Sequence, residues 1–179
     1  MDGILTRTRH NASGAQVMGL TLEGKMAYLN KIQVQAGVTL QQSHYSKPHI
    51  WNKEAPAVKK MMRTPNTYGY FTATYTPIKP LSIALSGTYT GSMLVPHEPV
   101  PGFLENPITV NTKDFFDIGL KAAYDFKLYK SMNLQVNAGI QNIFNAYQDD
   151  FDKGADRDSG YIYGPSLPRS FFAGVKISY

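Results

Sequence analysis

Most of the sequence alternates strictly between apolar and polar residues. Between residues 32 and 41, for example, every even position is apolar and every odd position is glutamine, glycine or threonine. A helix repeats its faces about every 3.6 residues, whereas successive side chains of a strand point to opposite faces. The pattern therefore predicts seven β-strands, which we place at residues 18–28, 32–41, 71–76, 81–90, 116–127, 133–141 and 171–179.

The length of these segments points to a membrane barrel. Several exceed ten residues, whereas strands of soluble proteins average about five or six. Runs of about 9–11 residues with alternating apolar and polar positions are typical of transmembrane β-barrels. The polar positions hold mainly glutamine, asparagine, serine and lysine, which suit a wet lumen better than a packed core. We therefore predict an all-β fold, an antiparallel transmembrane β-barrel segment of about seven long strands.

The connections between the segments alternate strictly between short and long. The short ones are Asn30-Lys31 and residues 77–80 and 128–131, and the long ones are approximately residues 46–65, 95–112 and 148–168. Outer-membrane barrels have short periplasmic turns and longer extracellular loops. The sequence therefore predicts the bacterial outer membrane, with the long loops outside. Interfacial aromatic girdles are expected at Tyr28, Tyr75, Phe126 and Tyr179 on one side and at Tyr89, Phe144 and Phe171 on the other.

Seven strands are an awkward number for a complete barrel, because single-chain bacterial barrels have even strand counts. An open sheet would also leave two unpaired edges in lipid. Residues 1–15 would add an eighth strand only with a poor alternation, and they hold no apolar run of signal-peptide length. We therefore expect residues 1–179 to be the C-terminal part of a larger barrel.

Composition removes several functional classes. The chain has no cysteine, which excludes thiol catalysis, disulfide frameworks and zinc–thiolate sites. The net charge of +5 comes without a basic stripe of interleaved aromatic residues, so we expect no nucleic-acid partner. No G-x-S-x-G motif, phosphate-binding glycine loop or His-Glu-x-x-His motif occurs. We therefore expect no enzymatic activity, no catalytic residues and no cofactor.

The first long connection is basic and carries the only tryptophan of the chain. It contains only one acidic residue, Glu54. Its ligand-binding candidates are Lys47, His49, Trp51, Lys53, Lys59, Lys60 and Arg63. Such a loop could attract an anionic ligand through its positive electrostatic field. The alternative is a solvated outer loop that touches anionic lipopolysaccharide. His44 and His49 have no third ligand in register, so we expect no metal site there.

The third long connection is acidic. Its carboxylates are Asp149, Asp150, Asp152, Asp156 and Asp158. Calcium binds such hard oxygens, but the glycine and the closing glutamate of an EF-hand are missing. Because Lys153 and Arg157 are interleaved with the acids, a self-paired polar loop is the favoured interpretation.

The last forty residues resemble one family. TonB-dependent outer-membrane receptors carry an NLF(N/D)xxY strand near their end, and a similar run occurs here as Asn137-Ala138-Gly139-Ile140-Gln141-Asn142-Ile143-Phe144-Asn145-Ala146-Tyr147. It is followed by Tyr163-Gly164-Pro165-Ser166-Leu167-Pro168-Arg169, which resembles the GxPR segment before the last strand of the same receptors. The sequence then stops on an aromatic residue, Tyr179, as outer-membrane barrels commonly do. The acidic loop is similar to those of receptors from Bacteroidetes-type bacteria.

The resemblance implies a 22-stranded barrel plugged by an N-terminal domain that is absent from residues 1–179. Such receptors take up scarce ligands such as siderophore-iron, haem or cobalamin. The implied partners are the TonB complex acting through the plug, outer-membrane lipid and lipopolysaccharide, the barrel-assembly machinery reading the C-terminal strand that ends at Tyr179, and a small-molecule or metal-chelate ligand. Without the plug, this chain alone could not be an energised transporter.

Two other classes of function stay open at the level of the sequence. One is a small complete outer-membrane β-barrel with a structural or adhesive role. The other is a soluble ligand-binding β-barrel. A plug-like domain encoded upstream in frame would favour the receptor fragment over the first, and refolding that depends on detergent would exclude the second.

Overall fold

The computed structural model describes residues 14–129, 131–165 and 167–179. Within them the chain forms long strands and loops, and no helix is long and apolar enough to cross a membrane. The long strands are β1 (Ala15–Tyr28), β2 (Ile32–His49), β4 (Thr67–Ile78), β5 (Leu81–Thr90), β8 (Phe115–Tyr129), β9 (Met132–Gln141) and β10 (Ser170–Ser178). All seven predicted strands are confirmed. The predicted contribution of residues 1–13 to an eighth strand lies outside the described residues.

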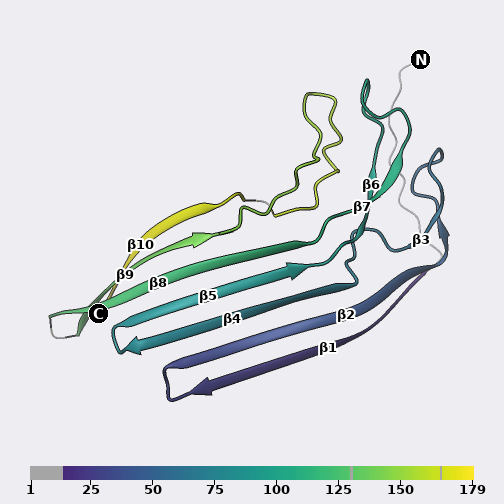
Figure 1. Cartoon of the computed structure of the whole chain (residues 1–179). Coiled ribbons are helices and arrows are strands. Elements are labelled where there is room, and N and C mark those ends of the chain that lie inside the picture. Colours follow the sequence, from purple (N-terminus) through teal and green to yellow (C-terminus); the bar gives the residue numbers. More distant parts are fainter. Residues whose placement is uncertain (1–13, 130, 166) are drawn as a thin grey trace.

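The long strands form one antiparallel sheet in which each strand pairs with the next along the chain (Figure 1). The order is β1-β2-β4-β5-β8-β9-β10, so β1 and β10 form the two edges of the described sheet. The all-β, antiparallel architecture expected from the sequence is therefore confirmed.

The strand register keeps one face of the sheet apolar throughout. Leu20 lies opposite Leu40, and Val136 lies opposite Val175. The same holds between β8 and β9, where Leu120 faces a β9 isoleucine. Large side chains of this face, such as Leu20 and Val175, are more than half exposed. None of the described residues covers this apolar face.

The opposite face is polar, and hydrogen bonds connect its side chains across strands. Tyr70 accepts a hydrogen bond from Gln35 (3.1 Å) and donates one to Glu23 (3.2 Å). Nearer the other edge, Gln135 donates to Asp125 at 2.8 Å. Exposed networks of this kind are compatible with water on this face, as the alternation predicted.

Three aromatic rings on the sheet lie against glycines directly opposite them. The pairs are Tyr70 with Gly37, Phe71 with Gly87, and Phe172 with Gly139. In each pair a side chain on the glycine would meet the ring. Such aromatic–glycine pairs help to define strand register, because any other residue would displace the ring.

The short turns lie together at one end of the sheet (Figure 1). In the first, Lys31 N donates to Tyr28 O at 3.0 Å, and Leu29 and Asn30 have φ of 48° and 52°. Two central residues with positive φ are typical of a type I′ hairpin turn. The turn therefore lies one residue earlier than the predicted Asn30-Lys31, because the alternation does not locate the left-handed residues.

The long connections contain strands that the sequence did not predict. β2 continues to His49, and β3 (Val58–Lys60) pairs with its far end. The second connection forms a hairpin of β6 (Leu94–His97) and β7 (Ile108–Asn111). β6 contains a proline, which normally argues against a strand within a sheet. It is tolerated here because the described β6 and β7 form a separate two-stranded sheet.

Candidate functional site

The three long connections meet at the end of the sheet opposite the short turns (Figure 1). Met93, Val95 and Tyr161 form a buried cluster, against which Val110 and Tyr163 pack. These residues belong to the second and third long connections, so the two loops share one small core. We call the packed assembly of residues 50–66, 91–114, 142–165 and 167–169 the loop cap.

Arg63 ties the first connection to the other two. Its backbone N–H donates to Leu94 O at 2.7 Å, and its guanidinium donates to Ile162 O at 3.0 Å and also to Gly160 O. The residue has a left-handed φ of 56°. Arg63 was predicted to attract an anionic ligand, but here its guanidinium holds backbone carbonyls of a neighbouring loop.

A buried hydrogen bond between a histidine and an aspartate lies in the middle of the loop cap. His97 Nε2 and Asp152 Oδ2 are 2.9 Å apart, and the two side chains are only 6% and 2% exposed. The ring of Tyr161 stacks on the imidazole, with centroids 3.8 Å apart and planes 4° apart. Asp152 Oδ2 also accepts from the backbone N–H of Asp158 at 3.1 Å. Its second oxygen, Oδ1, is buried and has no hydrogen-bond partner within the described part of the chain.

The neighbouring carboxylate, Asp150, accepts hydrogen bonds from two tyrosines. Tyr161 donates at 2.8 Å and Tyr163 at 2.5 Å. Partial burial acts to raise the pKa of Asp150, but hydrogen bonds from Tyr163, Tyr161, Gln148 and the backbone together outweigh it and lower that pKa overall. Burial and the bond to Asp150 raise the pKa of both tyrosines far above the usual value. The carboxylate is thus ionised and both hydroxyls stay protonated at neutral pH.

Two further acids of the third connection, Asp149 and Asp158, are also paired within the loop cap. Lys113 Nζ lies 2.7 Å from Asp149 Oδ2, and this bond lowers the pKa of Asp149 and raises that of Lys113. Asp158 accepts from the backbone N–H groups of Glu98 and Gly160 at 2.9 and 2.7 Å. The partners are not the interleaved Lys153 and Arg157 on which the self-paired interpretation relied. Among the described residues, no three His, Asp or Glu side chains are grouped to hold a metal ion.

The family-like motif residues tie the two ends of the third connection together. Asn142 is fully buried and has a φ of 50°. Its Nδ2 donates to Ala146 O and Leu167 O, both at 2.9 Å, and its Oδ1 accepts from Ala146 N at 2.8 Å. Asn145 Oδ1 accepts from Arg169 N at 2.9 Å. The two asparagines therefore form a clamp between the end of β9 and the start of β10.

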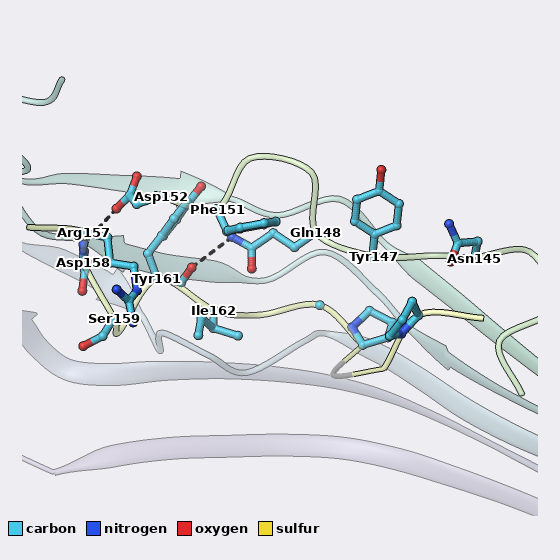
Figure 2. A pocket seen from close by; sticks show the side chains of 13 residues that line it. Asn145, Tyr147, Gln148, Phe151, Asp152, Arg157, Asp158, Ser159, Tyr161 and Ile162 are labelled. Atoms are coloured by element: carbon cyan, nitrogen blue, oxygen red, sulfur yellow. Dashed lines mark hydrogen bonds between the residues drawn. The ribbon is translucent and has the colours of Figure 1, made fainter. Parts of the chain in front are cut away.

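Asn145 of this clamp also lines a cavity of about 560 Å³, the loop pocket (Figure 2). Gln148 joins the two limbs of the loop around it, donating to Tyr161 O and accepting from Tyr163 N, both at 3.0 Å. The wall is mainly apolar and aromatic, while Asp152, Arg157 and Asp158 lie at one end. The volume suits a small molecule, which such a wall could stack against while the polar end orients it.

The predicted basic candidates are dispersed over the first connection. Lys47 and His49 lie in β2, Trp51 and Lys53 in the following turn, and Lys59 and Lys60 in β3. The last two line a separate cavity of about 400 Å³, together with Gln42, Ser43, His44 and Asn66. None of the predicted candidates lines the loop pocket. A ligand-binding role for these residues stays a prediction.

Sequence reasoning missed the aromatic residues of the loop pocket. Tyr147, Phe151 and Tyr161 lie in a segment that was interpreted from its acids alone. The sequence feature that could have indicated them is the presence of aromatic residues and prolines among those acids, because a fully solvated loop does not need aromatic side chains.

Comparison with known proteins shows the fold. No family model matches the sequence, and no curated protein matches it either. Among solved structures, the chain is similar to the ferric-catecholate import receptor Fiu of Escherichia coli K12 in its closed form, with a TM-score of 0.62 and 20% identity. The match covers 90% of this chain and 20% of the Fiu chain. The sheet thus has the fold of a segment of a β-barrel, and the chain spans about a fifth of that receptor's length.

Proposed function

We propose that the chain is a wall segment, with its outer loops, of a bacterial outer-membrane receptor that takes up a scarce ligand such as siderophore-iron, haem or cobalamin. One observation carries the proposal: the continuous apolar face of the sheet is exposed, and the opposite face is polar and hydrogen-bonded. Water is an unfavourable surrounding for such a face, since each square ångström of apolar surface costs about 25 cal/mol. Lipid removes this penalty.

The sheet edges favour a segment of a larger barrel over a small complete one. β1 and β10 are not paired with one another in the described sheet. Unpaired edges are not tolerated in the hydrocarbon region, so further strands must close the wall. The resemblance supplies the rest of the proposal: a barrel of 22 strands, a plug domain and energy delivered by the TonB complex.

The aromatic residues support a membrane crossing along the strands. Tyr28, Tyr75 and Phe126 lie near the short turns, and Tyr89 and Phe171 lie near the loop cap. Two such belts mark the interfaces of transmembrane barrels. The loop cap would then face outward, in contact with lipopolysaccharide, and the loop pocket would be open to ligands from outside. The fold shared with an import receptor is consistent with this orientation.

Deleting the complete gene in its host should abolish growth when the transported ligand is the limiting nutrient. Ferric siderophore, haem and cobalamin are each tested as the sole limiting source, and growth and uptake of the labelled compound are measured. Restoring the gene on a plasmid is the control. Unchanged growth and uptake on all three would contradict the proposed transport and favour the structural or adhesive barrel.

Tyr179 gives a second prediction, which concerns assembly. It is 99% exposed and follows the last residue of β10. We propose that the assembly machinery recognises this terminal strand, and that the ring lies in the membrane interface with its hydroxyl in water. Deleting Tyr179 should lower the folded, surface-exposed fraction of the full-length protein several-fold. Ser178→Ala, a change on the polar face, should not, and equal amounts of both variants would contradict the terminal signal.

A further inference from the structure

A second cavity, of about 500 Å³, lies between two loops of the cap. One wall is residues 100–103, at the tip of the β6–β7 hairpin, and the other is residues 149–156 of the third connection. The first wall is apolar, and the second carries most of the acids of that connection. We call this cavity the acidic groove.

The charge of the acidic groove is opposite to that of the chain. Its lining holds Asp149, Asp150, Asp152 and Asp156 against the single cation Lys153, although the whole chain has a net charge of +5. Asp149 and Asp150 are partly compensated by Lys113 and by two tyrosine hydroxyls. Asp156 has no hydrogen-bond or ion-pair partner among the described residues. The negative charge of the groove thus favours cations, whereas the positive net charge of the whole chain disfavours them.

The buried oxygen of Asp152 is the second observation. The side chain is 98% buried, since only 2% of its surface is exposed, and Oδ1 has no partner among the described residues. Asp152 lines both the acidic groove and the loop pocket. An unsatisfied buried acceptor is unfavourable, and a charged acceptor more so. A donor that enters the groove would satisfy this oxygen.

An aromatic ring in the groove already contacts a cation. Lys153 Nζ lies 5.7 Å from the centroid of the Phe151 ring, within the range of a cation–π interaction. On the opposite wall Phe103 is 77% exposed, so most of its side chain is accessible to a ligand. The lysine of the chain therefore occupies a position that an ammonium group of a ligand would also favour.

We propose that the acidic groove binds a small organic cation, with an ammonium group directed at Asp152 and Asp156 and an apolar body between Phe103 and Phe151. A volume of about 500 Å³ lies within the usual range for small-molecule sites. This inference rests on the proposed function, because it identifies the bound cation as part of the imported ligand.

Benzylamine is a suitable probe, because it joins an ammonium group to an aromatic ring. Binding to the purified full-length protein in non-ionic detergent is measured by saturation-transfer NMR and calorimetry. Benzylamine should bind, and its uncharged analogue benzyl alcohol should bind at least about fivefold more weakly, as expected for the loss of a charged contact. Equal binding of the two would overturn the proposal.

Variants then locate the binding. Asp156→Asn should weaken benzylamine binding about threefold to tenfold, because one facing carboxylate is lost. Asp125→Asn is the matched control, since it makes the same change outside the groove. Asp125 lies in β8, ten residues after Phe115 and toward the short turns. Lys153→Met should tighten binding about threefold by removing the competing ammonium from Phe151. Equal weakening by the two aspartate changes, or no effect of either Asp156→Asn or Lys153→Met, would overturn the assignment.

The two proposals fail separately in these experiments. If benzylamine bound but no tested ligand were taken up, the proposed cation binding would be supported and the proposed transport contradicted. If a ligand were taken up but the protein bound benzylamine and benzyl alcohol equally, the proposed transport would be supported and the proposed cation binding contradicted.

Discussion

Val136→Arg is expected to reduce the assembled protein in the outer membrane more strongly than any other single change on the sheet. Val136 lies near the middle of β9 on the apolar face, opposite Val175 of β10 and Tyr124 of β8, and is 41% exposed. An arginine on the lipid face at the bilayer midplane costs about 2–4 kcal/mol. The folded fraction is measured by heat-modifiable migration of the full-length protein from outer membranes.

The adjacent residue supplies the control. Gln135 points to the polar face and donates to Asp125 at 2.8 Å. An arginine there would face the same carboxylate and water, so Gln135→Arg should assemble nearly as well as the wild type. If the two variants lost the same amount of folded protein, the assignment of lipid and lumen faces would be wrong.

Asn142→Ala should release the third connection from the sheet. The change removes three hydrogen bonds of a fully buried side chain and leaves backbone groups of Ala146 and Leu167 without those partners. Such losses, with alanine held at a φ of 50°, should destabilise the loop by about 2–4 kcal/mol. Amide hydrogen exchange of residues 143–165 in the purified full-length protein should accelerate, by about thirtyfold to almost a thousandfold where local opening governs exchange.

A second substitution separates the clamp from the backbone conformation. Asn142→Gly tolerates the positive φ but loses the same hydrogen bonds. Exchange should therefore accelerate in this variant too, while the amides of β1 and β2 stay as protected as in the wild type. Wild-type protection of the loop in Asn142→Gly would show that the asparagine does not hold it.

The sheet was predictable from the sequence because strand formation here follows a local pattern. Leu81–Thr90 was assigned with the bounds that β5 has in the structure, since turn residues stop the alternation at both ends. β2 was assigned too short, because its alternation weakens after Gln41 while its pairing with β1 continues to Tyr45 opposite Ala15. Pairing with a neighbour extended the strand beyond the point where its own pattern ended.

The loop cap was much less predictable, and the acidic connection shows why. Asp149 was expected to pair with cations of its own loop, yet its partner is Lys113, 36 residues earlier. Asp152 pairs with His97, 55 residues away, although His97 carried no signal in the sequence. These contacts depend on which loop ends the sheet places side by side, and loops have no periodicity from which to read that order.

The sequence by itself determined the number of long strands, the two faces of each strand and the end of the sheet at which the long loops lie. Those features follow from side-chain alternation and connection length, which are properties of short stretches of chain. Only the tertiary structure decided that Arg63 binds carbonyls 97 and 99 residues away and that Asn142 closes the base of a loop. Such contacts form only after strand pairing has brought distant loops together, and no local pattern encodes them.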